Sequence, residues 1–190
     1  MRIILASSSP RRRELMKYIT SDFDAVSLDC DESLPENIPA VEASAYLAGV
    51  KAEAAAAKYT DCIVIGCDTT VICDNEVLGK PKDQEQCRKY MKMLSGRTHQ
   101  VVTGCTLIYR SFKRTFSVIT DVTFRELTDS EIDLYAASDE PYDKAGGYGI
   151  QGKGALLIER INGDFYNVVG LPVSRLNVEL KNFYNSIKGE

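Results

Sequence analysis

Residues 3–15 read IILASSSPRRREL, an apolar strand that passes through three serines into a basic helix. Pro10 suits the first turn of a helix because its missing N–H costs nothing there, and Ser9 before it is a favoured N-cap residue. The segment therefore predicts a strand over residues 2–6, a short turn, and a helix over residues 10–18. Such units are typical of folds in which helices pack on a sheet.

The turn of this unit predicts an anion site. Free backbone N–H groups at the start of a helix attract anions, whereas the charges of Arg11 and Arg12 oppose the helix dipole there. A bound phosphate would compensate this placement, because the guanidinium fork matches its oxygens and the hydroxyls of Ser7 and Ser9 lie nearby in sequence. The alternative is a basic helix start that is merely solvated, and we assign that role to Arg13.

Strands and helices alternate along the rest of the chain and predict an α/β fold with a mixed sheet flanked by helices. Long strands at residues 100–109 and 115–124 form a hairpin, so the sheet is not purely parallel. No internal repeat or linker divides the chain, and we expect one domain over residues 1–190. Further strands are predicted at 23–27, 62–67, 70–73, 76–78 and 155–161, and further helices at 41–58, 83–94, after a capping box at 128–131 and after Pro172.

Composition and charge exclude several classes of protein. Hydrophobic residues make up 44% and charged residues 26% of the chain, as in ordinary soluble globular proteins. No apolar run is long enough to cross a membrane and no secretory signal is present, so we expect a cytoplasmic protein. The net charge of -4 disfavours stable binding to nucleic acid. A single histidine, His99, disfavours a zinc site, and six cysteines without a C-x-x-C pair disfavour a disulfide framework.

Three features farther along the chain interrupt structural segments. Asp68 follows an apolar strand and is expected at its end, where functional residues gather in α/β sheets. A carboxylate there can bind Mg²⁺ or accept a proton from water, although a turn aspartate bound to backbone N–H groups is the alternative. Lys80 lies in a loop and could contact a phosphate, unless it is only solvated. The glycine-rich residues 146–154 could let the backbone approach a ligand, or form a mobile surface loop.

Two more charged residues could take part in the same chemistry. Glu32 lies in an acidic loop that could contribute to a metal site, and Lys51 lies among small apolar residues on the alanine-rich predicted helix. A solvated loop and an ordinary helix lysine are the alternatives. Taken together, these residues supply phosphate-binding cations and carboxylates, which are the groups needed for Mg²⁺-assisted phosphate chemistry.

Six motifs occur in the order found in Maf proteins, and the chain resembles this family over nearly its whole length. The motifs are SSSPRR (7–12), CDT (67–69), GKP (79–81), SGRTH (95–99), DKAG (143–146) and YGIQG (148–152). The resemblance implies the fold of the related inosine triphosphatases, an elongated mixed sheet with two lobes and a central cleft. It also implies hydrolysis of a nucleoside triphosphate to the monophosphate and pyrophosphate, a divalent metal cation (Mg²⁺ or Mn²⁺), and a homodimer.

The same resemblance implies roles for individual residues. Asp68 corresponds to the proton acceptor of the family and, with Glu32, would also bind the metal. Arg11, Thr69 and Gln151 match the selectivity residues of the branch that prefers dTTP and UTP. The residues that would bind the substrate are Ser7, Ser9, Arg11, Arg12, Lys51, Thr69, Lys80 and Gln151.

We therefore predict a metal-dependent enzyme that hydrolyses dTTP, UTP and modified pyrimidine triphosphates. Asp68 would orient or deprotonate a water that attacks the α-phosphorus, and Gln151 and Thr69 would read the pyrimidine by hydrogen bonds. Two alternatives stay open. One is a house-cleaning enzyme with the same chemistry on another base, and the other is a nucleotide-binding regulator of cell division and septum formation without turnover.

Overall fold

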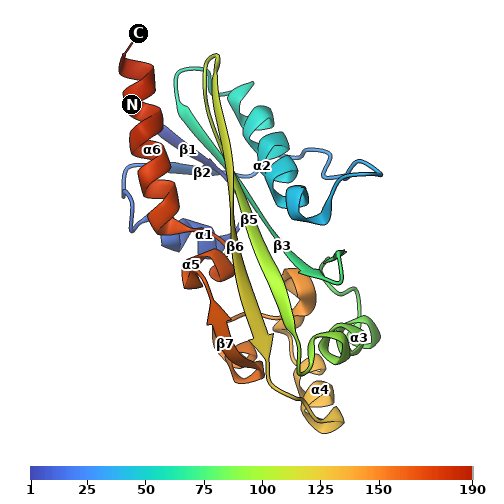
Figure 1. The fold of residues 1–190 in the computed structure, drawn as a ribbon. Coiled ribbons are helices and arrows are strands. Elements are labelled where there is room, and N and C mark those ends of the chain that lie inside the picture. The colour runs from blue at the N-terminus through green and yellow to red at the C-terminus, as the bar shows by residue number, and fades with distance from the viewer. Residues whose placement is uncertain (190) are drawn as a thin grey trace.

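The computed structural model describes residues 1–189, which form an elongated molecule around one sheet (Figure 1). The strands of these residues are β1 (Ile3–Ala6), β2 (Asp24–Val26), β3 (Ile63–Cys73), β4 (Glu76–Leu78), β5 (Thr98–Tyr109), β6 (Phe112–Phe124) and β7 (Ile158–Asn162). Their order is β2-β1-β3-β5-β6-β7, and β4 pairs with β3. Because β1 is parallel to β2 and β3 while the other pairs are antiparallel, the predicted mixed sheet is confirmed.

Helices flank the sheet, as expected. They are α1 (Pro10–Met16), α2 (Ala40–Ala56), α3 (Gln84–Leu94), α4 (Asp129–Ala136), α5 (Phe165–Val169) and α6 (Val173–Lys188), with short 3₁₀ helices η1 (Pro141–Asp143), η2 (Ala145–Gly147) and η3 (Gly152–Leu157). Ser9 caps α1 by accepting from the backbone N–H of Arg12, and Thr128 and Glu131 form both bonds of the predicted capping box. Among residues 1–189, no helix has the length and apolar character needed to span a membrane.

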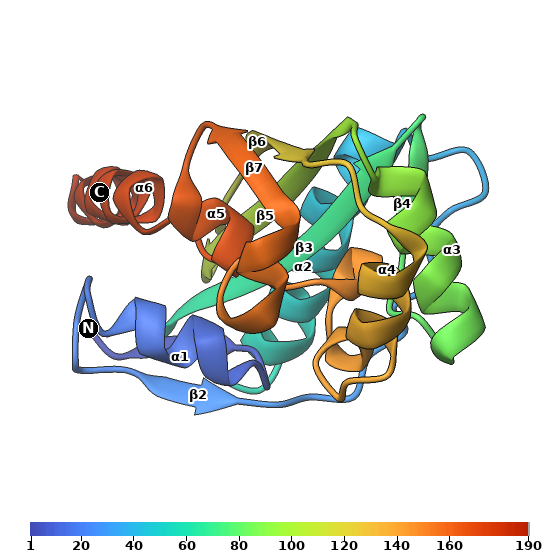
Figure 2. The ribbon, with the colours of Figure 1, turned by 90° about the horizontal axis from the view of Figure 1, so that it is seen from below.

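Two hydrophobic clusters cover opposite faces of the sheet at one end of the molecule. On β1, the side chain of Leu5 packs with α1 and α6, whereas Ile4 and Ala6 pack with α2. Since successive residues of a strand point to opposite faces, α2 lies on one face, and α1 and α6 lie on the other. Figure 2 shows this arrangement along the long axis.

A third cluster lies at the far end of the molecule, where α3 and α4 pack on the outer halves of β3, β5 and β6. Met91 of α3 and Ile132 of α4 contribute to this core together with Phe124 of β6. The three long strands therefore run through two separately packed regions. This arrangement agrees with the expectation of two lobes.

Two glycines allow α2 to lie directly on the sheet. A Cβ atom on Gly66 of β3 would overlap the carbonyl oxygen of Ala48, and one on Gly104 of β5 would overlap the backbone of Ala45. The alanines of α2 provide the matching small surface, so helix and strand backbones approach closely. This packing brings Lys51 of α2 over β3.

Several predicted strand boundaries differ from the structure. One is the start of β6, which lies at Phe112 and was predicted at residue 115, and two others concern β3 and β7. The strands predicted at 62–67 and 70–73 are one strand, β3, so Asp68 lies in the middle of a strand and not at its end. β5 pairs along this strand from residue 64 to residue 72, and the β-branched residues after Asp68 favour its continuation. The strand predicted at 155–161 begins only at Ile158, because the glycine-rich residues before it form η3.

His99 is buried next to the third cluster, at the end of the molecule that carries α3 and α4. Its ring makes edge contacts with Phe124 and Tyr148 at centroid distances of 5.1 and 5.4 Å. Its Nε2 atom lies 2.6 Å from the Tyr148 hydroxyl oxygen. Burial lowers the pKa of His99 from 6.5 to about 4, so the ring is neutral at neutral pH. The residue is part of the core and not of a metal site.

We expect the stability of the protein to fall as pH drops from 6.5 to 4, partly because of His99. The unfolded chain takes up a proton near the ordinary pKa of 6.5, whereas the folded protein does so only near 4. The contribution of His99 to the free energy of unfolding is fully present above pH 6.5. It amounts to about 3 kcal/mol, because each unit of pKa difference corresponds to 1.36 kcal/mol. Urea unfolding of the wild type and of His99→Gln across this range would measure it, and an equal slope in both proteins would contradict the prediction.

Candidate active site

A cavity of about 540 Å³ opens where β3 lacks a neighbour on one edge. On that edge β3 pairs with β1 up to Gly66 and with β4 from Val71, while the opposite edge pairs continuously with β5. Within residues 1–189, residues 67–70 therefore have no strand beside them on the cavity side. Asp68 and Thr69 point to opposite faces of β3, yet both line the cavity because it surrounds this open edge.

Every residue predicted for the site lines this cavity. They come from the β1–α1 turn, the first turn of α1, the loop before α2, α2 itself, the middle of β3, the segment after β4 and the glycine-rich region. The structure thus brings together side chains that the sequence places far apart, namely Ser7, Ser9, Arg11, Arg12, Glu32, Lys51, Asp68, Thr69, Lys80 and Gln151.

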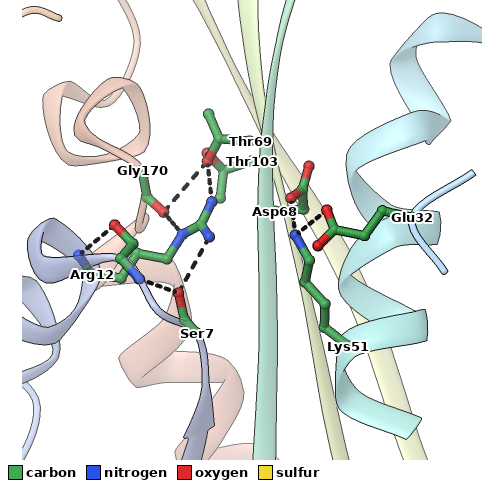
Figure 3. Close-up of polar contacts among 9 residues, drawn as sticks. Ser7, Arg12, Glu32, Lys51, Asp68, Thr69, Thr103 and Gly170 are labelled. Atoms are coloured by element: carbon green, nitrogen blue, oxygen red, sulfur yellow. Dashed lines mark hydrogen bonds and ion pairs between the residues drawn. The ribbon is translucent and has the colours of Figure 1, made fainter. Parts of the chain in front are cut away.

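Arg12 is fixed on one side of β3 by a set of hydrogen bonds (Figure 3). Its Nε donates to the carbonyl oxygen of Gly170 at 2.9 Å, and its Nη2 donates to Thr69 Oγ1 at 2.9 Å. A longer bond of 3.5 Å joins Nη1 to Ser7 Oγ. The remaining N–H groups of the guanidinium have no acceptor within residues 1–189 and could bind a phosphate oxygen.

Lys51 lies between two carboxylates on the other side of β3 (Figure 3). Its Nζ is 2.5 Å from Asp68 Oδ1 and 2.9 Å from Glu32 Oε2. The side chains of Lys51 and Asp68 are only 17% and 13% exposed, whereas that of Glu32 is 53% exposed. Burial lowers the pKa of Lys51, but the charge of Asp68 and the hydrogen bonds to both carboxylates outweigh it and raise the pKa above its ordinary value.

These two carboxylates fit a divalent cation that arrives with a substrate. Asp68 and Glu32 already converge on one positive charge, the Lys51 ammonium. Mg²⁺ is usually bound by one or two carboxylates together with substrate phosphates, so a complete set of protein ligands is not needed. Within residues 1–189 no group of three or more His, Cys, Asp or Glu side chains is placed to hold a metal ion, so oxygens of the substrate would have to complete the shell.

Arg11 connects the first turn of α1 to η1. Its Nη1 donates to Asp143 Oδ2 at 3.0 Å, and Lys144 Nζ donates to Asp143 Oδ1 at 2.6 Å. Desolvation raises the pKa of Asp143, but the hydrogen bonds from Lys144 and Arg11 outweigh it and lower the pKa. Lys80 and Gln151 are exposed at the cavity, and no side-chain hydrogen bond joins either of them to another residue of the described chain.

Three residues of the site were missed by reasoning from the sequence. Gly170 contributes a backbone carbonyl, which no side-chain pattern reveals. Asp143 and Lys144 belong to the motif DKAG (143–146), but the motif alone does not show that they contact the site. The bond from Arg11 to Asp143 and the bond from Lys144 to Asp143 reveal it. The nearby helix α5 was also missed, because five residues are too short to show a helical period.

Comparisons with known proteins show which family the chain belongs to. A family model described as "Maf-like protein" matches residues 2–183. A dTTP/UTP pyrophosphatase of Bacillus cytotoxicus is 46% identical over 182 residues, which cover 96% of this chain and 95% of the relative. The dTTP/UTP pyrophosphatase of Bacillus velezensis is 47% identical over 182 residues, with 96% of each chain covered.

A solved structure shows the same fold at much lower identity. The HAM1 protein of Coxiella burnetii superposes with a TM-score of 0.55 over 96% of this chain and 99% of that chain, at 14% identity. The family model covers nearly all of the sequence, and the relatives match it along almost their full lengths. The chain therefore belongs to the Maf-like protein family.

Proposed function

We propose that this protein is a nucleoside triphosphate pyrophosphatase that hydrolyses dTTP and UTP to the monophosphate and pyrophosphate. The observation that carries the proposal is the open edge of β3. There Arg12, with unused donors, and the Lys51–Asp68 pair reach one cavity from opposite faces of the strand. The names of relatives that are 46–47% identical over 96% of the chain support the same activity.

The β1–α1 turn would bind the triphosphate. The free N–H groups of Arg12, the turn hydroxyls and the exposed ammonium of Lys80 can neutralise phosphate oxygens from several directions. Because the contacts with Thr69 and Gly170 already fix the guanidinium of Arg12, little side-chain freedom is lost on binding. Arg11 would leave or share its bond to Asp143 when an anion enters.

Asp68 would orient the attacking water and take its proton. Lys51 holds Oδ1 of Asp68 in place, whereas Oδ2 has no hydrogen-bond partner within residues 1–189 and can accept from water. A carboxylate positioned in this way contributes to catalysis as a general base. When bound to Asp68 and Glu32, Mg²⁺ or Mn²⁺ would neutralise charge on the phosphate oxygens.

The finer features of the proposal follow from the family resemblance. Arg11, Thr69 and Gln151 would select the pyrimidine base, modified pyrimidines included. We also propose a cytoplasmic homodimer. A single domain over residues 1–190 fits the long strands β3, β5 and β6, which pass through both packed regions.

A panel of nucleoside triphosphates tests this function. With Mg²⁺ or Mn²⁺ we expect pyrophosphate release from dTTP and UTP at least about 10-fold faster than from CTP, ATP or GTP, because a site that hydrogen-bonds one base rejects others. Excess EDTA should abolish the release. Turnover confined to another base would favour the same chemistry on a different substrate. Binding without pyrophosphate release with either metal would favour a regulator of septum formation.

A further inference from the structure

Thr103 of β5 lies next to Thr69 of β3, on the side away from the cavity, and has no part in the function proposed above. The two residues are partners in the pairing of β3 with β5, and their Oγ1 atoms are 2.9 Å apart. Thr69 lines the cavity, whereas Thr103 is fully buried and does not line it. Thr103 can act on the site through Thr69, or through the carbonyl of Asn167, which also accepts from the N–H of the cavity-lining Gly170.

The surrounding hydrogen bonds fix the direction in which each hydroxyl donates. Thr103 Oγ1 lies 3.0 Å from the carbonyl oxygen of Asn167, and because a carbonyl oxygen can only accept, Thr103 gives its proton to it. Thr69 then donates to Thr103 and accepts from Arg12 Nη2. The result is a directed chain from the guanidinium through two hydroxyls to a backbone carbonyl, whose first members are drawn in Figure 3.

The opposite direction makes poorer bonds. If Thr103 donated to Thr69, the proton of Thr69 would have only the carbonyl oxygen of Gly170, at 3.5 Å. That oxygen already accepts from Arg12 Nε at 2.9 Å. The buried carbonyl of Asn167 would also lose one of its donors, which costs free energy in the protein interior.

We propose that Thr103 is a positioning residue that takes the proton of Thr69 and so turns a lone pair of Thr69 toward Arg12. Thr69 then faces the guanidinium and the cavity as an acceptor only, and Arg12 keeps the orientation in which its free N–H groups can bind phosphate. The inference rests on the proposed function, since it concerns the binding of a nucleoside triphosphate at the same site.

Thr103→Val removes the hydroxyl with little change of shape, and Thr106→Val is its matched control. Thr106 lies on the same strand, is also fully buried, and pairs with Thr115 through Oγ1 atoms 2.9 Å apart, away from the cavity. Both variants thus remove the hydroxyl of a buried threonine that is hydrogen-bonded to a more accessible threonine on the neighbouring strand. A purely structural role would lower the thermal midpoint in both and leave the kinetics of both unchanged.

The expected result is a kinetic difference between them. Thr103→Val should raise KM for UTP about 10-fold with a smaller change in kcat, because Arg12 binds the triphosphate before and during the reaction. Thr103→Ser should stay within about 3-fold of the wild type and Thr106→Val should match it. Adding Thr103→Val to Thr69→Val should have no further effect, since Thr103 acts through Thr69. If Thr103→Val does not fold, Thr103→Ala takes its place.

An equilibrium measurement separates this inference from the proposed function. The dissociation constant of a UTP analogue with an imido group between the α- and β-phosphorus is measured for the same variants. A wild type that binds the analogue but does not hydrolyse UTP would contradict only the proposed function, and the binding constants would still decide the role of Thr103. Equal affinity of Thr103→Val and wild type, additive effects with Thr69→Val, or no binding at all would overturn the inference.

Discussion

Asp68→Asn is expected to lower kcat for pyrophosphate release from UTP by about 10²–10⁴-fold, the usual contribution of a general base. The amide has nearly the shape of the carboxylate but cannot take a proton from water. Lys51 keeps its bond to Glu32 in the variant, so its charge is not left unpaired. A coupled assay of pyrophosphate release gives kcat, and thermal unfolding reports whether the fold is intact.

Asp121→Asn is the matched control for this variant. Asp121 is also a strand aspartate, but it lies on β6 and does not line the cavity. Its replacement should leave kcat within about 2-fold of the wild type, as is usual for substitutions outside a functional site. Near-normal turnover by Asp68→Asn would remove Asp68 from its proposed role, whatever the control shows.

Arg12→Lys is expected to lower kcat/KM for UTP by about 100-fold, mainly through KM. Lysine keeps the positive charge but cannot reach Ser7, Thr69 and Gly170 at once, so the free donors are no longer held toward the cavity. Since 1.4 kcal/mol corresponds to a factor of ten, a 100-fold loss corresponds to about 3 kcal/mol. This lies at the upper end of the range of about 1.5–3 kcal/mol that a hydrogen bond to a charged group contributes.

Arg13→Lys provides the comparison within the same helix turn. Arg13 is exposed, bonds only to the carbonyl oxygen of Ser8 among the described residues, and does not line the cavity. The Arg13→Lys variant should therefore have the same kcat/KM for UTP as the wild type. Wild-type kinetics in both Arg12→Lys and Arg13→Lys would mean that the turn acts through its overall charge, which lysine preserves, and not through one oriented guanidinium.

Local signals predicted the elements of the fold well where the deciding contacts are short in sequence. The Ser9 cap, Pro10 in the first helical turn and the capping box at Thr128 all form within one turn of helix. The long hairpin of β5 and β6 shows the same agreement, since its two strands adjoin in sequence. In contrast, α5 and the start of β7 depend on packing around them and were missed or misplaced.

The position of Asp68 shows where this kind of reasoning fails. An apolar run followed by a carboxylate looks like a strand that ends, because a buried charge in mid-strand is unfavourable without compensation. Here the compensation comes from Lys51, a residue seventeen positions earlier on α2. The close packing of α2 on Gly66 and Gly104 brings the two together, and no local pattern encodes that contact.

By itself, the sequence determined the mixed α/β class and the strand–turn–helix unit, because these depend on local propensity. It also pointed to the residues that line the cavity, some through residue types that suit phosphate, and others, such as Thr69 and Gln151, only through the resemblance to Maf proteins. Only the tertiary structure decided how those residues act together. The gap between β1 and β4 along one edge of β3 depends on strand pairing, and the chain from Arg12 through Thr69 and Thr103 depends on the register of β3 against β5. Both arise from contacts between segments distant in sequence, which is the physical reason that only the folded chain reveals them.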